Sequence, residues 1–114
     1  MNNIRNQVQL IGRLGKDAET LTFDDGKVKT KLVISTNDSW SAKDEDQVIQ
    51  RTQWHDVVAW NGLAQLLSKS RMGDKIAVQG RLTYRTYEDG DGHSRYIAEV
   101  VATNVLFINP DSVV

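Results

Sequence analysis

Hydrophobic and polar residues alternate along most of this chain, which is the pattern of β-strands with one buried face. In the first such stretch Val8, Leu10 and Leu14 occupy one parity, while polar Gln7 and Gln9 occupy the other. Because side chains two residues apart on a strand share a face, this alternation predicts a sheet whose apolar side is covered. The predicted strands are residues 6–14, 18–23, 27–37, 52–60, 75–87 and 95–109.

Two segments depart from this period of two. Residues 61–72 carry apolar side chains at helical spacing and predict the one convincing helix, with Asn61 as its N-cap and Gly73 as its C-terminal stop. Residues 38–51 follow neither period and include a charged run, so they predict an exposed, mobile loop.

Glycines inside the first strand, Gly12 and Gly15, predict bends or bulges that curl the sheet. Five principal strands, with the helix between the third and the fourth, outline an all-β fold, a closed five-stranded barrel of the OB type. Barrels of this type bind oligonucleotides on one face, so the outline favours a binding module.

Composition limits the class of protein further. A chain of 114 residues supports one domain, expected over residues 1–110, with 111–114 as a short end without a tail. Its 14 basic and 15 acidic residues give no overall positive charge, so any attraction for a polyanion is local. Cysteine is absent, and no stretch matches a secretory signal or a membrane span, so we expect a soluble, cytoplasmic protein with no membrane partner.

The sequence lacks recognisable motifs for catalysis or metal binding. His55 and His93 are far apart and have no third ligand at a recognisable spacing. The segment that begins at Asp89 superficially resembles a calcium loop, but it lacks the required glycine and glutamate, so residues 88–94 predict a hairpin turn. We therefore expect no enzyme activity, no cofactor and no metal.

Aromatic residues define the expected binding site. Trp54 and Trp60 share one parity of a predicted strand, and Asp56 between them indicates a wet face, because an unpaired carboxylate is costly to bury. Trp40 stands at the root of the predicted loop, where a plug for the barrel end and a stacking role fit equally well. Together with Tyr87, these rings would stack unpaired bases.

Basic residues on or beside the same strands are expected to follow the phosphates, namely Arg5, Arg13, Lys31, Lys43, Arg51 and Arg85. Lys27 and Lys29 are interpreted instead as a solvated row that discourages edge pairing. Tyr84 and Phe107 fit the alternative role of filling the core.

Three ordered motifs resemble those of bacterial single-stranded DNA-binding proteins. The first is Asn-x-Val-x-Leu-Ile-Gly-x-Leu-Gly-x-Asp-x-Glu from Asn6, and the second is Thr-x-Trp-His-x-Val-Val from Thr52, followed by Leu63-Ala64. The third is Gly-x-Leu-x-x-Arg-x-Tyr-x-Asp from Gly80, continued by Gly-x-x-Arg-Tyr-x-x-Glu-Val-Val from Gly92. The resemblance covers residues 4–108.

This resemblance implies an OB-fold protomer of a homotetramer that binds single-stranded DNA at the nucleoid during replication, recombination and repair. It places the family's stacking aromatics at Trp40, Trp54, Trp60 and Tyr87, where the family often has phenylalanine at the third position and tryptophan at the fourth. It assigns His55 to a subunit interface. An alternative is the primosomal replication-restart adaptor, which shares the fold but acts mainly through protein contacts.

The chain departs from the family pattern in two ways. Asn3, Gln7, Asp56 and Gly62 stand at positions that are commonly basic, so we expect fewer neutralised phosphates and a weaker dependence of affinity on salt. The family's long linker and acidic tip, which recruit other replication and repair proteins, do not follow residue 110 here. We therefore expect a short paralogue or a piece of a longer protein, and partners of that kind cannot be inferred.

Overall fold

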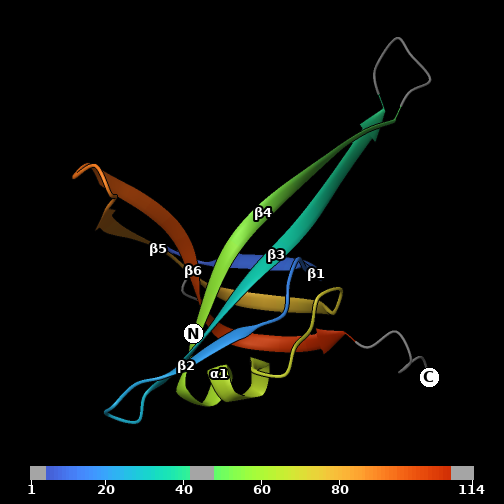
Figure 1. The fold of residues 1–114 in the computed structure, drawn as a ribbon. Coiled ribbons are helices and arrows are strands. Elements are labelled where there is room, and N and C mark those ends of the chain that lie inside the picture. The colour runs from blue at the N-terminus through green and yellow to red at the C-terminus, as the bar shows by residue number, and fades with distance from the viewer. Residues whose placement is uncertain (1–4, 42–47, 109–114) are drawn as a thin grey trace.

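The computed structural model describes residues 5–41 and 48–108, with the backbone alone described at 39–41 and 48 (Figure 1). Lys43 and residues 111–114 lie outside the described residues. The elements are β1 (Val8–Leu14), β2 (Glu19–Thr22), β3 (Val28–Ser41), β4 (Val48–Trp60), α1 (Asn61–Leu67), β5 (Lys75–Glu88) and β6 (Ser94–Ile108). No helix in the described part of the chain is long and apolar enough to cross a membrane.

The strands form a closed barrel. They lie in one six-stranded sheet in the order β1-β5-β6-β4-β3-β2, and β1 also pairs with β3 through Leu14↔Ile34. This extra pairing joins β1, β5, β6, β4 and β3 into a ring, to which β2 adds only along β3. The structure confirms the predicted all-β, five-stranded OB-fold barrel with one short helix between β4 and β5.

The core lies inside this ring and consists of the apolar parity of each strand. Leu32 and Ile34 from β3 and Val57 from β4 are fully buried there with Ile76 and Val78 from β5. Helix α1 adds to the core by burying Ala64 and Leu67. The buried Thr30 hydroxyl donates to the Ala64 carbonyl oxygen at 2.7 Å, which fixes the helix to β3.

Two glycines allow backbones to touch where the ring is tightest. A Cβ at Gly12 would overlap the Ser35 carbonyl oxygen, at the point where β1 meets β3. A Cβ at Gly80 would overlap the Val101 carbonyl oxygen, next to an irregularity in the β5–β6 register. Gly12, which was expected to bend the first strand, is thus required for closing the barrel.

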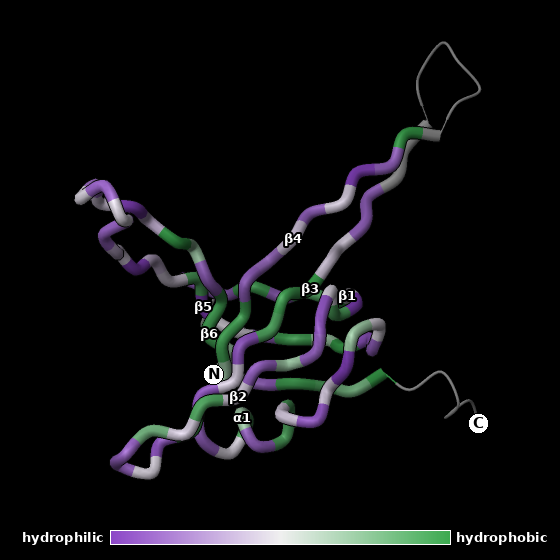
Figure 2. The backbone as a smooth tube through the Cα atoms, viewed as in Figure 1, coloured by the Kyte–Doolittle hydropathy of each residue, from purple (hydrophilic) through white to green (hydrophobic). Residues whose placement is uncertain are grey.

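Two hairpins extend from the barrel as separate arms (Figure 1). The β3–β4 ladder continues from Lys29↔Trp60 to Ser41↔Val48, so the predicted loop over residues 38–51 is wrong at both ends. Its polar residues still form a ladder because both faces of the arm contact solvent, and the Thr52 hydroxyl donates to Asn37 Oδ1 across the strands at 2.7 Å. Figure 2 shows the arms as largely hydrophilic, whereas hydrophobic and hydrophilic segments are mixed along the barrel strands.

Two further expectations are corrected. The helix ends at Leu67, not at residue 72, and its N-cap is Trp60, because the Asn61 side chain instead accepts a hydrogen bond from the Val28 amide at 3.4 Å. Tyr84 and Phe107 do not fill the core, since 67% and 48% of their surfaces are exposed. In the described chain no layer covers the sheet faces on which they stand.

Gly12→Ala is expected to lower the free energy of unfolding by about 1–3 kcal/mol, because the added Cβ overlaps backbone that cannot move without opening the β1–β3 contact. Urea unfolding monitored by tryptophan fluorescence measures this change. Gly62→Ala is the control: nothing lies within 4 Å of a Cβ there, so stability should stay constant or rise by up to about 1 kcal/mol. Equal losses in the two variants would contradict a specific close approach at Gly12.

Candidate nucleic-acid interface

One face of the β3–β4 hairpin carries the tryptophans. Trp54, Asp56, Val58 and Trp60 of β4 alternate onto this face, and Ser35, Val33, Lys31 and Lys29 of β3 lie directly opposite them in that order. We call these eight residues the outer face. As predicted from the alternation, the core residues Val57 and Ala59 project to the other side. Trp54 is 61% exposed and Trp60 39% exposed, so both rings are accessible.

Trp54 lies against the backbone of Gly15. A Cβ at Gly15 would overlap the six-membered ring of Trp54, so only glycine leaves room for the indole in this position. The Gly15 amide donates to the Val33 carbonyl oxygen at 2.8 Å, which holds the loop after β1 against β3. Sequence reasoning assigned Gly15 to a bend and missed its contact with the tryptophan.

Trp60 has two neighbours that the sequence did not identify. Phe23, from the turn between β2 and β3, stacks on Trp60 with ring centroids 6.1 Å apart and planes at 25°. The Lys29 ammonium lies over the Trp60 ring, 5.4 Å from its centroid. Lys29 is therefore half-buried against an aromatic and is not simply part of a solvated row, whereas Lys27 is exposed and paired with Asp25 at 3.9 Å. The position of Phe23 just before the Asp24-Asp25-Gly26 turn was its only sequence signal.

The β5–β6 arm contributes a further accessible ring. Tyr87 is 43% exposed and shares its face of the arm with Arg85, while Arg95 and Ile97 lie directly opposite these two residues on β6. Arg85 and Ile97 also line the space between the arms, so this face of the arm is directed toward the outer face of the β3–β4 hairpin. Tyr84 has the opposite parity and lies on the other side of the arm.

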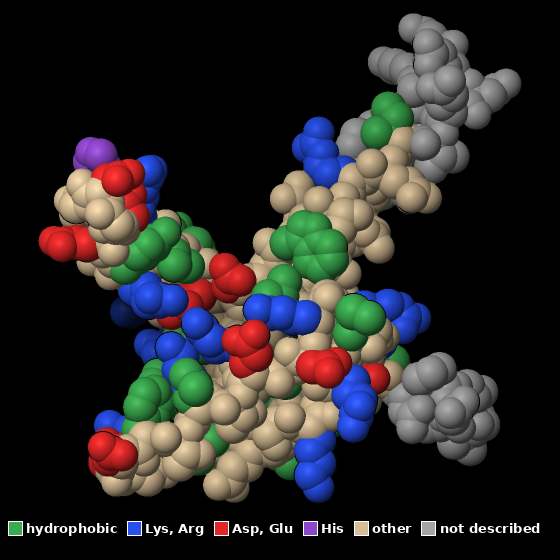
Figure 3. Space-filling view, viewed as in Figure 1, with side chains coloured by type: hydrophobic (Ala, Val, Ile, Leu, Met, Phe, Trp, Pro, Cys, Tyr) green, Lys and Arg blue, Asp and Glu red, His purple; other side chains and the backbone are tan. Residues whose placement is uncertain are grey.

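A depression lies between the two arms, and we call it the central depression. It has a volume of about 160 Å³. Val33, Val58 and Ile97 supply apolar lining, while Lys31, Asp56 and Glu99 are among its charged residues. Figure 3 shows basic and acidic side chains intermingled between the arms, with hydrophobic groups on either side. The region has a mixed charge and is not a uniform basic patch.

Several cations near the central depression are paired within the protein. Arg85 Nε lies 3.3 Å from Glu99 Oε1, and Glu99 is buried, with 8% of its surface exposed. Lys16 Nζ lies 3.2 Å from Glu19 Oε1. Arg13 does not line the depression, and its Nη1 donates to the Gly73 carbonyl oxygen at 2.9 Å. Lys31, by contrast, lines the central depression and forms no ion pair with any residue in the described part of the chain.

The other described residues that were predicted to bind nucleic acid do not line the central depression. Arg5 is exposed beside Asn6, whose side chain bonds both backbone groups of Leu82 at the base of the β5–β6 arm. Arg51 is exposed on the β3–β4 arm, at the parity opposite to Trp54. The backbone of Trp40 pairs with Ile49, but its side chain lies outside the described residues, as does Lys43.

His55 lies on the reverse side of the hairpin from the tryptophans. It is half-buried opposite Ile34, and its Nε2 is 2.9 Å from the Thr36 hydroxyl oxygen. The ring is thus held in place at the base of the β3–β4 arm, with part of its surface accessible.

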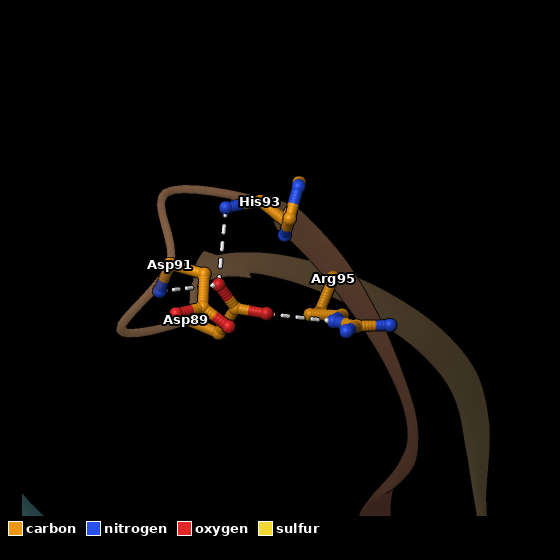
Figure 4. Close-up of polar contacts among 4 residues, drawn as sticks. All are labelled: Asp89, Asp91, His93 and Arg95. Atoms are coloured by element: carbon orange, nitrogen blue, oxygen red, sulfur yellow. Dashed lines mark hydrogen bonds and ion pairs between the residues drawn. The ribbon is translucent and has the colours of Figure 1, made fainter.

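The tip of the β5–β6 arm is organised by one carboxylate (Figure 4). Asp89 Oδ1 accepts from the amides of Asp91 and His93, both at 3.0 Å, and Asp89 Oδ2 accepts from Arg95 Nε at 2.9 Å. The Arg95 hydrogen bond lowers the pKa of Asp89, and the His93 and Asp91 amides lower it further. Desolvation acts in the opposite direction. The ligand atoms of Asp89, Asp91 and His93 lie close enough together to bind one cation. The Arg95 guanidinium already neutralises Asp89, however.

Comparison with known proteins gives consistent matches. The model of the single-strand binding protein family matches residues 5–108. A single-stranded DNA-binding protein of Bacteroides thetaiotaomicron is 35% identical over 107 residues, which are 92% of this chain and 66% of that protein. Single-stranded DNA-binding protein 1 of Xylella fastidiosa is 36% identical over 104 residues, which are 90% of this chain and 76% of that protein. The chain thus spans about two thirds to three quarters of these relatives.

Solved structures agree on the fold. The Plasmodium falciparum SSB in complex with ssDNA superposes with a TM-score of 0.81 at 24% identity, covering 96% of this chain and all of that one. A deletion mutant of the single-stranded DNA binding protein from Thermus aquaticus superposes with a TM-score of 0.79 at 25% identity, covering 92% of this chain and 51% of that one.

The Asp89 carboxyl is expected to titrate below the usual aspartate pKa of about 3.9, and Arg95→Gln should raise its pKa. Because the folded pKa is lowered, the stabilisation of the hairpin tip is present above about pH 4 and is lost as the pH falls through the folded value. Carboxyl-carbon NMR measures both titrations. Arg95→Lys, which keeps the charge, should restore part of the shift, and identical curves for all three proteins would contradict the role of Arg95.

Proposed function

The chain belongs to the single-strand binding protein family, and on this premise we propose that it binds and protects single-stranded DNA, largely independently of sequence, during replication, recombination and repair. The observation that carries the proposal is the pair of accessible tryptophans on one face of β4. Rings that serve only to fill a core would not leave 61% and 39% of Trp54 and Trp60 exposed. The same exposure favours direct strand binding over an adaptor that acts through protein contacts.

Base stacking supplies most of the affinity in this proposal. Each base stacked on an aromatic ring contributes about 1–3 kcal/mol, and every base offers such a face, so binding tolerates any sequence. The strand runs over Trp54 and Trp60, with Phe23 extending the ring surface of Trp60 and Tyr87 providing a further ring from the other arm. Trp40 is proposed as an additional ring farther along the β3–β4 arm, at a ladder position whose parity is opposite to that of Trp54.

Phosphate contacts are expected to be few. Lys31 lies at the centre of the path, and Arg5, Arg13, Lys43 and Arg51 would act at its margins. Arg85 must exchange Glu99 for a phosphate before it can contribute. The logarithm of the binding constant for a single strand falls with the logarithm of salt by about 0.7 per neutralised phosphate, so these few cations imply a shallow salt dependence. Binding proceeds without a catalytic step, a cofactor or a metal.

Self-association completes the proposed unit, a homotetramer acting at the nucleoid in the cytoplasm. Ile11, Ala77 and Leu106 form a row across β1, β5 and β6 on the outside of the barrel, and Ile11 and Leu106 are 52% and 66% exposed. Association would remove this apolar surface from water, at about 25 cal/mol per Å². His55, on the reverse of the tryptophan hairpin, is proposed to contact a neighbouring subunit.

Trp54→Ala is expected to raise the Kd for labelled oligo-thymidine about 5- to 150-fold, the equivalent of 1–3 kcal/mol of lost stacking. Fluorescence anisotropy measures the Kd, and quenching of intrinsic tryptophan emission gives a second signal in the wild type. Lys27→Ala, whose ammonium is exposed and paired with Asp25, should change the Kd little. Equal effects of the two substitutions, or no quenching of the wild type, would refute the assigned face.

Leu106→Asp should reduce the oligomer to a smaller species, because it places a charge in the apolar row that association would bury. Light scattering gives the mass of each species in solution. Leu66→Asp is the matched control, since Leu66 is 62% exposed on α1, away from the row. A wild type that is monomeric, or a Leu66→Asp variant that dissociates equally, would contradict this interface.

A further inference from the structure

The central depression lies on the proposed path of the strand, between the two tryptophans. Asp56 is two residues from Trp54 and four from Trp60, which corresponds to about 7 Å and 13 Å along a strand. A strand that stacks on both rings therefore passes over Asp56. The volume of about 160 Å³ is below the ~300–1,000 Å³ of sites for drug-sized ligands and suits a single planar ring.

Four residues of the β3–β4 ladder form one side of this depression in a square. Asp56 lies directly opposite Val33, and Val58 directly opposite Lys31. The carboxylate and the ammonium thus stand on one diagonal, and the two valines on the other. Diagonal neighbours in an antiparallel pair are about 7–8 Å apart, and Asp56 and Lys31 form no ion pair. Apolar surface between a separated acceptor and donor can accommodate a flat heterocycle.

Asp56 is the carboxylate of the depression that remains available. Glu99 is paired with Arg85, and Glu19 with Lys16. Asp56 is exposed and has no hydrogen bond or ion pair with any residue in the described part of the chain. A carboxylate only accepts hydrogen bonds, so it repels phosphate and carbonyl oxygens but binds amino groups.

Building on the proposed function, we propose that the central depression holds one nucleobase and that Asp56 accepts a hydrogen bond from its exocyclic amino group. Lys31 donates to an acceptor at the other end of the same base edge, and the half-buried Val33 contacts the ring. Cytosine fits because N4 is a donor and O2 is an acceptor, at the two ends of its Watson–Crick edge on either side of N3. Uracil presents carbonyl oxygens at both ends, so one of them faces the carboxylate. The protein therefore favours cytosine over uracil or thymine.

This preference concerns base composition and leaves stacking as the general source of affinity. It also explains how a face that binds a polyanion accommodates an unpaired acid. In the bound strand the bases face the tryptophans and the phosphates face outward, so Asp56 meets a base edge instead of a phosphate. The charge reversal relative to the family pattern becomes a means of selecting bases.

The test compares labelled oligodeoxycytidine and oligodeoxyuridine of equal length at pH 8, where cytosine is not protonated. These strands differ at position 4 and in the N3 proton, and neither carries the thymine methyl group. Anisotropy titrations should give the wild type a Kd at least about 5-fold lower for deoxycytidine, since a good base contact of this kind discriminates by about 1–3 kcal/mol. Asp56→Ala should bring the ratio of the two Kd values close to one.

Asp38→Ala is the matched control, because it removes an equal charge from the same hairpin at the opposite parity. It should change both Kd values together and leave their ratio as in the wild type. A wild-type ratio of one, or the same ratio in wild type and Asp56→Ala, would overturn the base-selecting role while leaving strand binding intact. Failure of the wild type to bind either strand would overturn the proposed function as well.

Discussion

The unbroken antiparallel ladder between β3 and β4 determines the sides on which the interface and the core lie. Because side chains alternate with a period of two, a shift of one residue would exchange the two faces and bury the tryptophans. The register that places Val57 and Ala59 in the core places Trp54, Asp56 and Trp60 on the outside. Burial of the apolar parity therefore fixes the aromatic parity, and the binding face needs no separate stabilisation.

Electrostatics and stacking contribute unequally to this face. Arg85 and Lys16 are each paired with a glutamate within the protein, so the surface between the arms is close to neutral. A phosphate that approaches Arg85 competes with a buried carboxylate, and this exchange offsets much of its attraction. Ring stacking meets no such competition. The protein is consequently suited to hold a strand by its bases, with the phosphates left largely to solvent.

Much of the fold could be predicted because its signals are local. Alternation identified the strands, and the leucine spacing identified α1, so the barrel followed from their order. The limits of the arms could not be predicted, since polar residues such as Asn37 and Asp38 suit a loop and a solvated ladder equally. The contacts of Phe23 with Trp60, of Gly15 with Trp54 and of Glu99 with Arg85 join residues far apart in sequence. Only closure of the barrel brings them together, so their spacing carries no signal.

The contact between Gly15 and Trp54 also links two positions in any change of sequence. A side chain at position 15 and an indole in this orientation at position 54 occupy the same volume, so they are mutually exclusive. An indole in this orientation at position 54 therefore requires glycine at position 15, whereas glycine at position 15 leaves position 54 open to other side chains. A change at position 15 would therefore force the Trp54 indole out of this orientation, although one residue lies in a loop and the other in a strand.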